Sequence, residues 1–259
     1  MDSPRVVILA GGLGTRLREE TEFRPKPMVE VGGKPIVWHI MKGFAHYGLT
    51  SFIVCVGYKG EIIKDYFLNY RARNNDFTVT LGEHEQVEFH GRHAESNWTV
   101  TVADTGDDTM TGGRVFQTRP YVDGTFICTY GDGLADVPID RLLEFHRSHG
   151  ALATVTTVQP LSRFGVMEVI GDGVVERFRE KPQQQGWVNA GFFVFEPGVF
   201  DYLDESSVLE QDPLARLAAD NQLRAYRHDG FWQPMDTYRE LVLLNGLWDS
   251  GDAPWKVWS

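Results

Sequence analysis

The feature that most constrains this chain is a continuous apolar run, Val6–Ala10, that ends directly in glycines. Such an unbroken run is typical of a strand buried on both faces, as in a parallel sheet. A helical pattern follows, in which Ile36, Ile40 and Phe44 recur four residues apart, and Ser51–Val56 is a second buried run. Strand, helix and strand in this order predict a parallel sheet with helical crossovers, which makes the fold α/β.

The rest of the chain keeps this rhythm, with one interruption. Residues 77–103 alternate apolar and polar positions and contain few helix formers, which predicts a small antiparallel β insertion. Because no linker, repeat or low-complexity segment follows, we expect residues 1–259 to form a single domain with a Rossmann-like, mixed and mostly parallel sheet flanked by helices. The later elements expected are strands at 125–130, 153–158, 166–170, 174–178 and 190–195 and helices at 139–149, 213–219 and 238–248.

The composition excludes several classes of protein. Of the 259 residues, 42% are apolar and 24% are charged, as in ordinary soluble globular proteins. The formal net charge of −11 argues against a general nucleic-acid or anionic-membrane binder, whereas a small phosphorylated substrate needs only a few local cations. We expect a cytoplasmic protein, because no run approaches the roughly 20 apolar residues that span a bilayer and the N-terminus lacks a signal peptide's apolar region. Cys55 and Cys128 lie in apolar runs and are expected to be buried and reduced.

A glycine-rich motif, Leu-Ala-Gly-Gly-Leu-Gly-Thr-Arg-Leu at residues 9–17, follows the first strand. Glycines here allow backbone N–H groups to approach a phosphate chain, while Thr15 can donate its hydroxyl and Arg16 can bind phosphate oxygens. The spacing differs from the dinucleotide-binding fingerprint, and the Gly-Lys-Ser/Thr ending of a P-loop is absent. On its own, the motif is equally compatible with a tight turn that merely requires glycine.

A second motif, Pro25-Lys26-Pro27, follows soon after the glycine loop. Two prolines hold the backbone extended and stiff, so that the lysine between them is presented in a defined direction. A lone lysine of this kind is more often a solvated turn residue. With the glycine loop before it, we favour Lys26 as a phosphate ligand.

Together, these two motifs resemble the paired signature of the sugar-1-phosphate nucleotidylyltransferase family. The likeness extends nearly end to end, and in detail the chain is most similar to the glucose-1-phosphate cytidylyltransferase branch of that family. The segments that carry the likeness are 34–42, 57–60, 104–107, 110–114, 130–133 and 231–237.

The resemblance implies a reaction. CTP and α-D-glucose 1-phosphate would bind with Mg²⁺, a phosphate oxygen of the sugar phosphate would attack the α-phosphorus of CTP in line, and CDP-glucose and pyrophosphate would leave. The attacking oxygen is already anionic near neutral pH, so alignment and charge neutralisation should provide most of the catalysis. Residues 1–135 would then be mainly the nucleotide-binding half, and 136–259 mainly the sugar-phosphate-binding half with the C-terminal helix.

The resemblance also assigns roles to residues. Arg16, Lys26 and Asp132 are implied as catalytic, and Asp132 and Asp236 as the ligands of Mg²⁺, which typically takes one or two carboxylates plus phosphates and water. Nucleotide contacts are implied at Leu9, Ala10, Gly11, Gly12, Leu13, Gly14, Thr15, Arg16, Lys26, Thr109, Arg114 and Gly131. Sugar-phosphate contacts are implied at Glu180, Lys181 and Asn189.

Each of these roles has a purely structural alternative. Asp132 lies in a Gly-Asp-Gly turn, although its place after a strand also puts it at the edge of the sheet where α/β proteins bind ligands. Asp236 could be the N-cap of the last helix. Residues 105–114 could form a mobile surface loop, and Glu180 with Lys181 an exposed ion pair of little energetic value.

Three other functions compete with this interpretation. The first is a homologue that uses UTP or dTTP. The second is a non-catalytic nucleotide-sugar sensor, which we disfavour because the metal carboxylates, Lys26 and Arg16 are all present. The third is a glycosyltransferase on a related scaffold, which should carry an Asp-x-Asp motif. By family analogy we expect a homo-oligomer, with the aromatic tail and the insertion 77–103 as contact surfaces, and a role in deoxysugar and polysaccharide synthesis.

Overall fold

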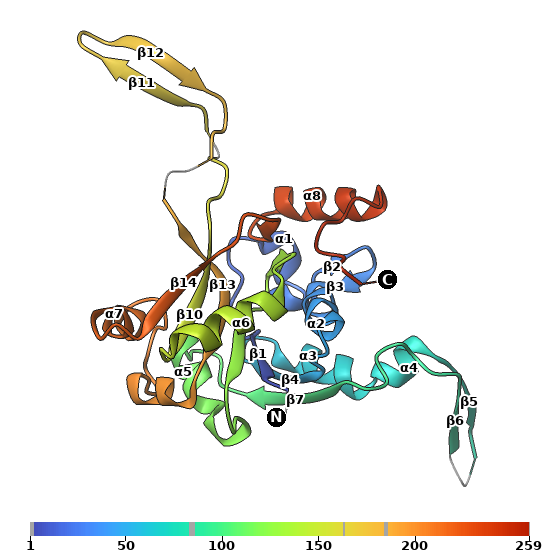
Figure 1. Ribbon diagram of the computed structural model, residues 1–259. Helices are drawn as coiled ribbons and strands as arrows, with labels where there is room; N and C mark the ends of the chain where they lie inside the picture. The colour runs from blue at the N-terminus through green and yellow to red at the C-terminus, as the bar shows by residue number, and fades with distance from the viewer. Residues whose placement is uncertain (1–2, 83–85, 163, 184–185, 259) are drawn as a thin grey trace.

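The computed structural model describes residues 3–82, 86–162, 164–183 and 186–258, and within them seven strands form the central sheet (Figure 1). The strand order is β14–β10–β13–β8–β1–β4–β7. All of these strands run in the same direction except β13, which is antiparallel to both neighbours. The predicted mixed, mostly parallel sheet is therefore confirmed. Its strands are β1 (Arg5–Leu9), β4 (Ser51–Val56), β7 (Thr99–Asp104), β8 (Phe126–Tyr130), β10 (Ala153–Val158), β13 (Val188–Phe195) and β14 (Leu223–Arg227).

Helices cover both faces of this sheet, so each strand contributes alternate residues to two apolar layers. Val6 and Ile8 of β1 lie in the layer under α2 (Ile36–His46), whereas Val7 and Leu9 lie in the opposite layer. The first layer is also covered by α3 (Gly60–Leu68), α6 (Ile139–His149) and α8 (Tyr238–Asp249), and the second by α5 (Thr111–Gln117), the 3-10 helix η3 (Pro197–Tyr202) and α7 (Asp212–Ala219). Cys55 and Cys128 are buried free thiols in the second layer, as expected.

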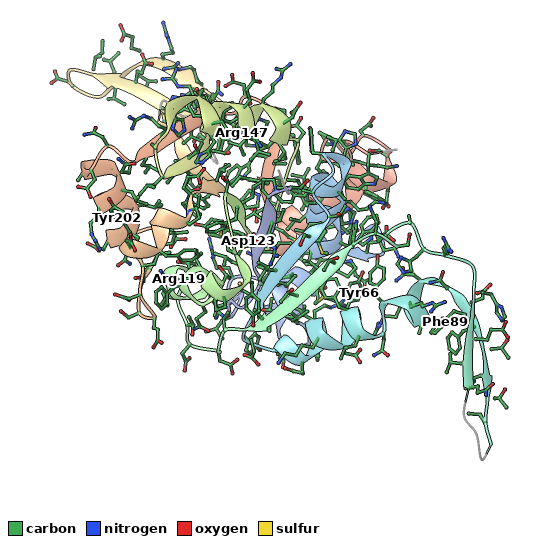
Figure 2. All side chains as sticks on the ribbon, turned by 60° about the horizontal axis from the view of Figure 1, so that its bottom comes forward. Tyr66, Phe89, Arg119, Asp123, Arg147 and Tyr202 are labelled. Atoms are coloured by element: carbon green, nitrogen blue, oxygen red, sulfur yellow. The ribbon has the colours of Figure 1, made fainter. Side chains whose placement is uncertain are left out.

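Two antiparallel hairpins project from the body in different directions (Figure 1). The first, β5 (Asp76–Thr80) with β6 (Gln86–His90), corresponds to the predicted insertion, and Figure 2 shows Phe89 on this arm, well away from the sheet. The second is β11 (Val166–Ile170) with β12 (Val174–Arg179). The sequence predicted these two strands but did not indicate that they leave the body together.

The predicted extent of the insertion is wrong at its end. Residues 99–102 belong to β7, which pairs in parallel with β4 as the edge strand of the central sheet. An edge strand is partly exposed to solvent, so apolar and polar residues alternate along it. A strand of a projecting hairpin shows the same alternation.

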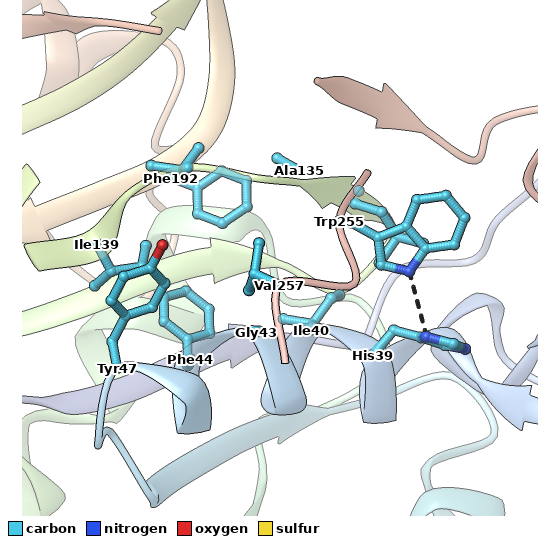
Figure 3. Close-up of a pocket in the computed structure, with 13 residues that line it drawn as sticks. His39, Ile40, Gly43, Phe44, Tyr47, Ala135, Ile139, Phe192, Trp255 and Val257 are labelled. Atoms are coloured by element: carbon cyan, nitrogen blue, oxygen red, sulfur yellow. Dashed lines mark hydrogen bonds between the residues drawn. The ribbon is translucent and has the colours of Figure 1, made fainter. Parts of the chain in front are cut away.

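The C-terminal aromatic tail packs against α2 rather than standing free. Trp255 is 1% exposed, and its indole N–H donates to Nδ1 of His39 over 3.3 Å (Figure 3). Nε2 of His39 donates to the carbonyl of Val31 at 2.8 Å, so the ring is neutral, and burial lowers the pKa of His39 to about 4. The remaining cavity beneath the tail is only about 20 Å³. Within the aromatic tail, which was expected to be a contact surface, Trp255 is therefore part of the protein's own core.

Several short elements connect the larger ones. The short elements are α1 (Arg18–Thr21), η1 (Lys26–Met28), β2 (Glu30–Val31), β3 (Lys34–Pro35), α4 (Tyr70–Asn74), η2 (Arg119–Tyr121), β9 (Gly133–Ala135) and β15 (Trp232–Pro234).

No helix among the described residues has the length and apolar character needed to cross a bilayer.

Candidate active site

The loops that follow β1 and β8 lie side by side at the carboxyl edge of the sheet. The two strands are neighbours with Leu9 opposite Tyr130, and the N–H of Gly131 donates to the carbonyl of Leu9 at 3.0 Å. Ligands of open α/β sheets bind at this edge. Strand pairing therefore brings the glycine-rich motif next to the segment that carries Asp132.

A cavity of about 600 Å³ opens between these loops and residues 107–114. Its volume is within the usual range of sites for small organic ligands. All the residues implied as nucleotide contacts line it, namely Leu9, Ala10, Gly11, Gly12, Leu13, Gly14, Thr15, Arg16, Lys26, Thr109, Arg114 and Gly131. Asp132 lines it as well.

The glycine loop needs glycine for two distinct reasons. Gly14 has φ +62°, a left-handed conformation that other residues adopt at a cost. At Gly11, a Cβ would lie 2.1 Å from Nη1 of Arg114, so this glycine makes room for a buried guanidinium. The loop is thus shaped for close approach both to the cavity and to the protein beneath it.

Four charged side chains meet beside this loop. Nζ of Lys26 lies 2.6 Å from Oδ2 of Asp132 and 2.7 Å from Oδ1 of Asp236. Nη1 of Arg16 lies 2.8 Å from the other oxygen, Oδ2, of Asp236. The lysine side chain is only 10% exposed, whereas that of Arg16 is 72% exposed. The structure therefore joins the four residues for which the resemblance implied catalytic or metal-binding roles.

Local structure explains how each member of this charged cluster reaches its place. Lys26 begins η1 after Pro25, which fixes the direction of its backbone. Asp132 lies two residues after the end of β8, and Asp236 two residues after the end of β15, which pairs with β9 just after Asp132. The N-cap of α8 is Thr237, whose N–H donates to the Glu240 side chain at 2.6 Å, so the carboxylate of Asp236 is turned toward Lys26 and Arg16 instead of capping the helix.

The carboxylate pair suits a hard divalent cation that also binds a ligand. Asp132 and Asp236 direct oxygens toward the same point, the ammonium of Lys26. In the described part of the chain, no group of three or more histidine, cysteine, aspartate or glutamate side chains is arranged to hold a metal. Two carboxylates without a third protein ligand fit Mg²⁺, which completes its shell with phosphates and water, and do not fit a structural zinc site.

Arg114 lies beneath the cavity and is largely engaged by the protein itself. Its side chain is buried, and burial lowers the pKa of the guanidinium. Nη1 donates to the carbonyl of Val56 at 3.1 Å and to the Thr105 hydroxyl at 2.6 Å, while Nη2 donates to the carbonyls of Gly11 at 3.0 Å and Asp107 at 3.2 Å. Both terminal nitrogens therefore tie three loops of the site together.

A polar chain that the sequence did not reveal links the far wall of the cavity to the start of β13. The hydroxyl of Tyr130 donates to Glu210, which also accepts from the Thr111 hydroxyl at 2.6 Å. Nδ2 of Asn189 donates to the Tyr130 hydroxyl at 3.3 Å. Burial and the neighbouring Glu210 raise the pKa of Tyr130, which keeps its hydroxyl protonated. Nothing local in the sequence marks Glu210, because its partners lie in distant segments.

The residues implied for the sugar phosphate divide into two groups. Asn189 adjoins the cavity through Tyr130, which lines it. Glu180 and Lys181 lie exposed at the root of the β11–β12 arm and are not among the residues that line the cavity. Nζ of Lys181 is 3.8 Å from Oε1 of Glu180, and the lysine backbone has φ +44°.

Comparisons with known proteins identify the family of this chain. The family model described as "Nucleotidyl transferase" matches residues 5–237. The glucose-1-phosphate cytidylyltransferase of Salmonella typhimurium is 50% identical to this chain, covering 98% of it and 99% of the relative. A probable glucose-1-phosphate cytidylyltransferase of Bacillus subtilis is 46% identical, covering 98% of this chain and 100% of the relative.

Solved structures agree at the level of the fold. HddC from Yersinia pseudotuberculosis superposes with a TM-score of 0.68 at 22% identity, covering 95% of this chain and 100% of HddC. A UDP-glucose pyrophosphorylase complexed with UDP-glucose gives 0.69 at 15% identity, covering 96% and 100% of the two chains. From the match over residues 5–237 and the two relatives above 45% identity, we conclude that the chain belongs to the nucleotidyl transferase family, in its glucose-1-phosphate cytidylyltransferase branch.

Proposed function

We propose that this protein transfers the cytidylyl group of CTP to α-D-glucose 1-phosphate and releases CDP-glucose and pyrophosphate. The observation that carries the proposal is the meeting of Arg16, Lys26, Asp132 and Asp236 beside a glycine loop that lines a cavity of about 600 Å³. The names of the relatives from Salmonella typhimurium and Bacillus subtilis support the choice of base and sugar.

The proposed reaction is a single displacement at the α-phosphorus of CTP. A phosphate oxygen of glucose 1-phosphate forms the new P–O bond, the bond between the α-phosphorus and the oxygen bridging to the β-phosphate breaks, and pyrophosphate leaves with the electron pair. The attacking oxygen is anionic near neutral pH, so no side chain has to remove a proton. Alignment and the neutralisation of charge carry the rate enhancement.

The residues of the site divide this work. The backbone N–H groups of residues 11–14 face the phosphates, and Lys26 and Arg16 supply positive charge beside them. Asp132 and Asp236 would hold Mg²⁺, which neutralises phosphate charge when bound. Arg114 holds the glycine loop against the loop at residues 105–109, and Thr109 contacts the nucleotide from that second loop.

We assign the sugar phosphate to the second half of the chain. Asn189 is the nearest of the three implied contacts, through its bond to Tyr130. Glu180 and Lys181 precede it closely in sequence, and their exposure leaves them free to move toward a bound sugar phosphate. In this proposal residues 1–135 bind mainly the nucleotide and residues 136–259 mainly the sugar phosphate.

The test crosses CTP, UTP, dTTP, ATP and GTP against glucose 1-phosphate and its mannose, galactose and N-acetylglucosamine analogues, with pyrophosphate release as the readout. Release confined to CTP with glucose 1-phosphate supports the proposal. Release with UTP or dTTP would keep the mechanism and change the base. Nucleotide binding without release from any pair would favour a sensor.

We also propose that the protein is a homo-oligomer. The β11–β12 arm exposes seven apolar side chains on one hairpin, whereas apolar residues on the surface of a monomer are usually scattered singly. The residues concerned are Val166, Met167, Val169, Ile170, Val174, Val175 and Phe178. Light scattering of the intact protein and of a Met167→Lys, Phe178→Lys variant tests this: a reduced mass for the variant is expected, and a monomeric wild-type protein would contradict it.

A further inference from the structure

The ammonium of Lys26 occupies the point at which the two site carboxylates converge. It donates to Oδ2 of Asp132 at 2.6 Å and to Oδ1 of Asp236 at 2.7 Å, and among the described residues these two carboxylates are its side-chain partners. The carboxylates are 30% and 13% exposed, so neither is fully solvated. Without a cation between them, two such partly buried negative charges would repel each other.

A divalent cation bound by the two oxygens that accept from Lys26, one on each carboxylate, would need this position. Mg²⁺ binds carboxylate oxygens at about 2.0–2.1 Å and requires near-octahedral geometry, which leaves no room for an ammonium between the same oxygens. Lys26 and the metal therefore compete for Asp132 and Asp236. If both were bound between these oxygens, the ammonium of Lys26 and the metal ion would be two positive charges in contact.

The structure allows the lysine side chain to leave while the rest of the cluster stays in place. Its backbone is fixed in η1, where the Val29 N–H donates to the Lys26 carbonyl at 3.1 Å, so only the four-carbon stem has to move. Arg16 binds the other oxygen of Asp236 and continues to neutralise it. Lys26 also lines the cavity, so a phosphate bound there offers its ammonium a new anionic partner.

We infer that Lys26 is a displaceable counter-ion. It holds the carboxylate pair in the nucleotide-free protein and releases it to Mg²⁺ only when the phosphates of a bound nucleotide take over the ammonium. The inference rests on the proposed function, and it makes binding of the metal and the nucleotide mutually dependent. Such coupling is reciprocal, so each ligand raises the affinity for the other by the same factor.

The test measures metal binding with Mn²⁺ as the probe and loss of the free-ion electron paramagnetic resonance signal as the readout, after subtraction of the Mn²⁺ that CTP alone binds in a protein-free sample. No sugar phosphate is added, so that no turnover occurs. The wild-type protein is expected to bind Mn²⁺ weakly alone and about tenfold or more tightly with CTP. Lys26→Met should bind Mn²⁺ about tenfold more tightly than wild type without nucleotide, and the stimulation by CTP should shrink.

Two further variants serve as controls, one for the positive charge at position 26 and one for the loss of a lysine elsewhere on the protein. Lys26→Arg keeps the positive charge and should retain the weak binding of wild type. Lys64→Met removes a lysine that pairs with an exposed carboxylate, Asp104, at 2.7 Å, and should leave Mn²⁺ binding unchanged. Thermal unfolding with and without Mn²⁺ adds a second readout, since at one Mn²⁺ concentration the metal alone should stabilise Lys26→Met more than wild type or the control variants.

Failure of the inference can be told apart from failure of the proposed function. If Lys26→Met gains no Mn²⁺ affinity, or if wild type binds Mn²⁺ tightly without nucleotide, the counter-ion role is overturned even when CTP binds. Equal tightening in the Lys64→Met control would also overturn it. If wild type does not bind CTP at all, with or without Mn²⁺, the proposed function fails first.

Discussion

The backbone N–H of Met235 donates to the carbonyl of Asp132 over 2.8 Å, and this bond places the two site aspartates next to each other. It extends the short ladder between β15 and β9, whose strands come from distant parts of the chain. The relative position of the two carboxylates therefore depends on a small antiparallel pairing outside the central sheet. Both carboxylates then meet Lys26, which comes from a third segment.

Replacing Asp132 with alanine should lower the rate of pyrophosphate release at saturating Mg²⁺ by about 100-fold or more, because a carboxylate beside the reacting phosphates is lost. The fold should remain, since this side chain is partly exposed and contacts only Lys26 among the charged residues described. Steady-state assays together with circular dichroism check this. An active Asp132→Ala enzyme would remove the residue from the metal site.

The tie made by Arg114 predicts an effect on stability as well as on substrate binding. In Arg114→Met, the carbonyls of Val56, Gly11 and Asp107 each lose one charged donor, and the free energy of unfolding should fall by about 3 kcal/mol. The KM for CTP should rise because the glycine loop is no longer held. Urea unfolding and kinetics test both effects, and a raised KM with unchanged stability would instead indicate a direct contact with the nucleotide.

Adjacent glycines provide a matched pair of variants. In Gly11→Ala, the new Cβ would meet the Arg114 guanidinium at 2.1 Å, so we expect the KM for CTP to rise about tenfold. In Gly12→Ala, no heavy atom of the protein lies within 4 Å of the new Cβ, so the free energy of unfolding should change little, whereas Gly11→Ala should lower it. Equal free energies of unfolding for the two variants would show that the guanidinium does not shape the loop.

His39 predicts a loss of stability in mild acid. Its pKa is about 4 in the folded protein and 6.5 for a solvated histidine, so between these values the unfolded chain binds a proton that the native protein does not. Stability should therefore fall as the pH drops below 6.5, by about 2 kcal/mol at pH 5 from this residue alone. Urea unfolding at pH 7.5 and pH 5 should show a smaller loss in His39→Gln, and equal losses would contradict the account.

The sequence predicts best what depends on neighbours in the chain. The buried run Val6–Ala10, the glycine loop and the Pro-Lys-Pro turn are local patterns, and the parallel sheet follows from them. The place of β7 could not be predicted, because a half-solvated edge strand and a hairpin strand share one alternating pattern. Glu210 could not be found either, since its role depends on Tyr130 and Thr111 in distant segments. The burial of Trp255 likewise depends on His39, far away in sequence.

The central claim is that this protein transfers a cytidylyl group from CTP to glucose 1-phosphate and does so at the charged cluster beside the glycine loop. The most direct measurement is pyrophosphate release by the purified protein with Mg²⁺, CTP and glucose 1-phosphate, with product identified as CDP-glucose by mass spectrometry. We predict release that requires all three components and that is strongly reduced in Lys26→Ala. Absence of release with this pair, in a protein that is folded and binds CTP, would contradict the claim.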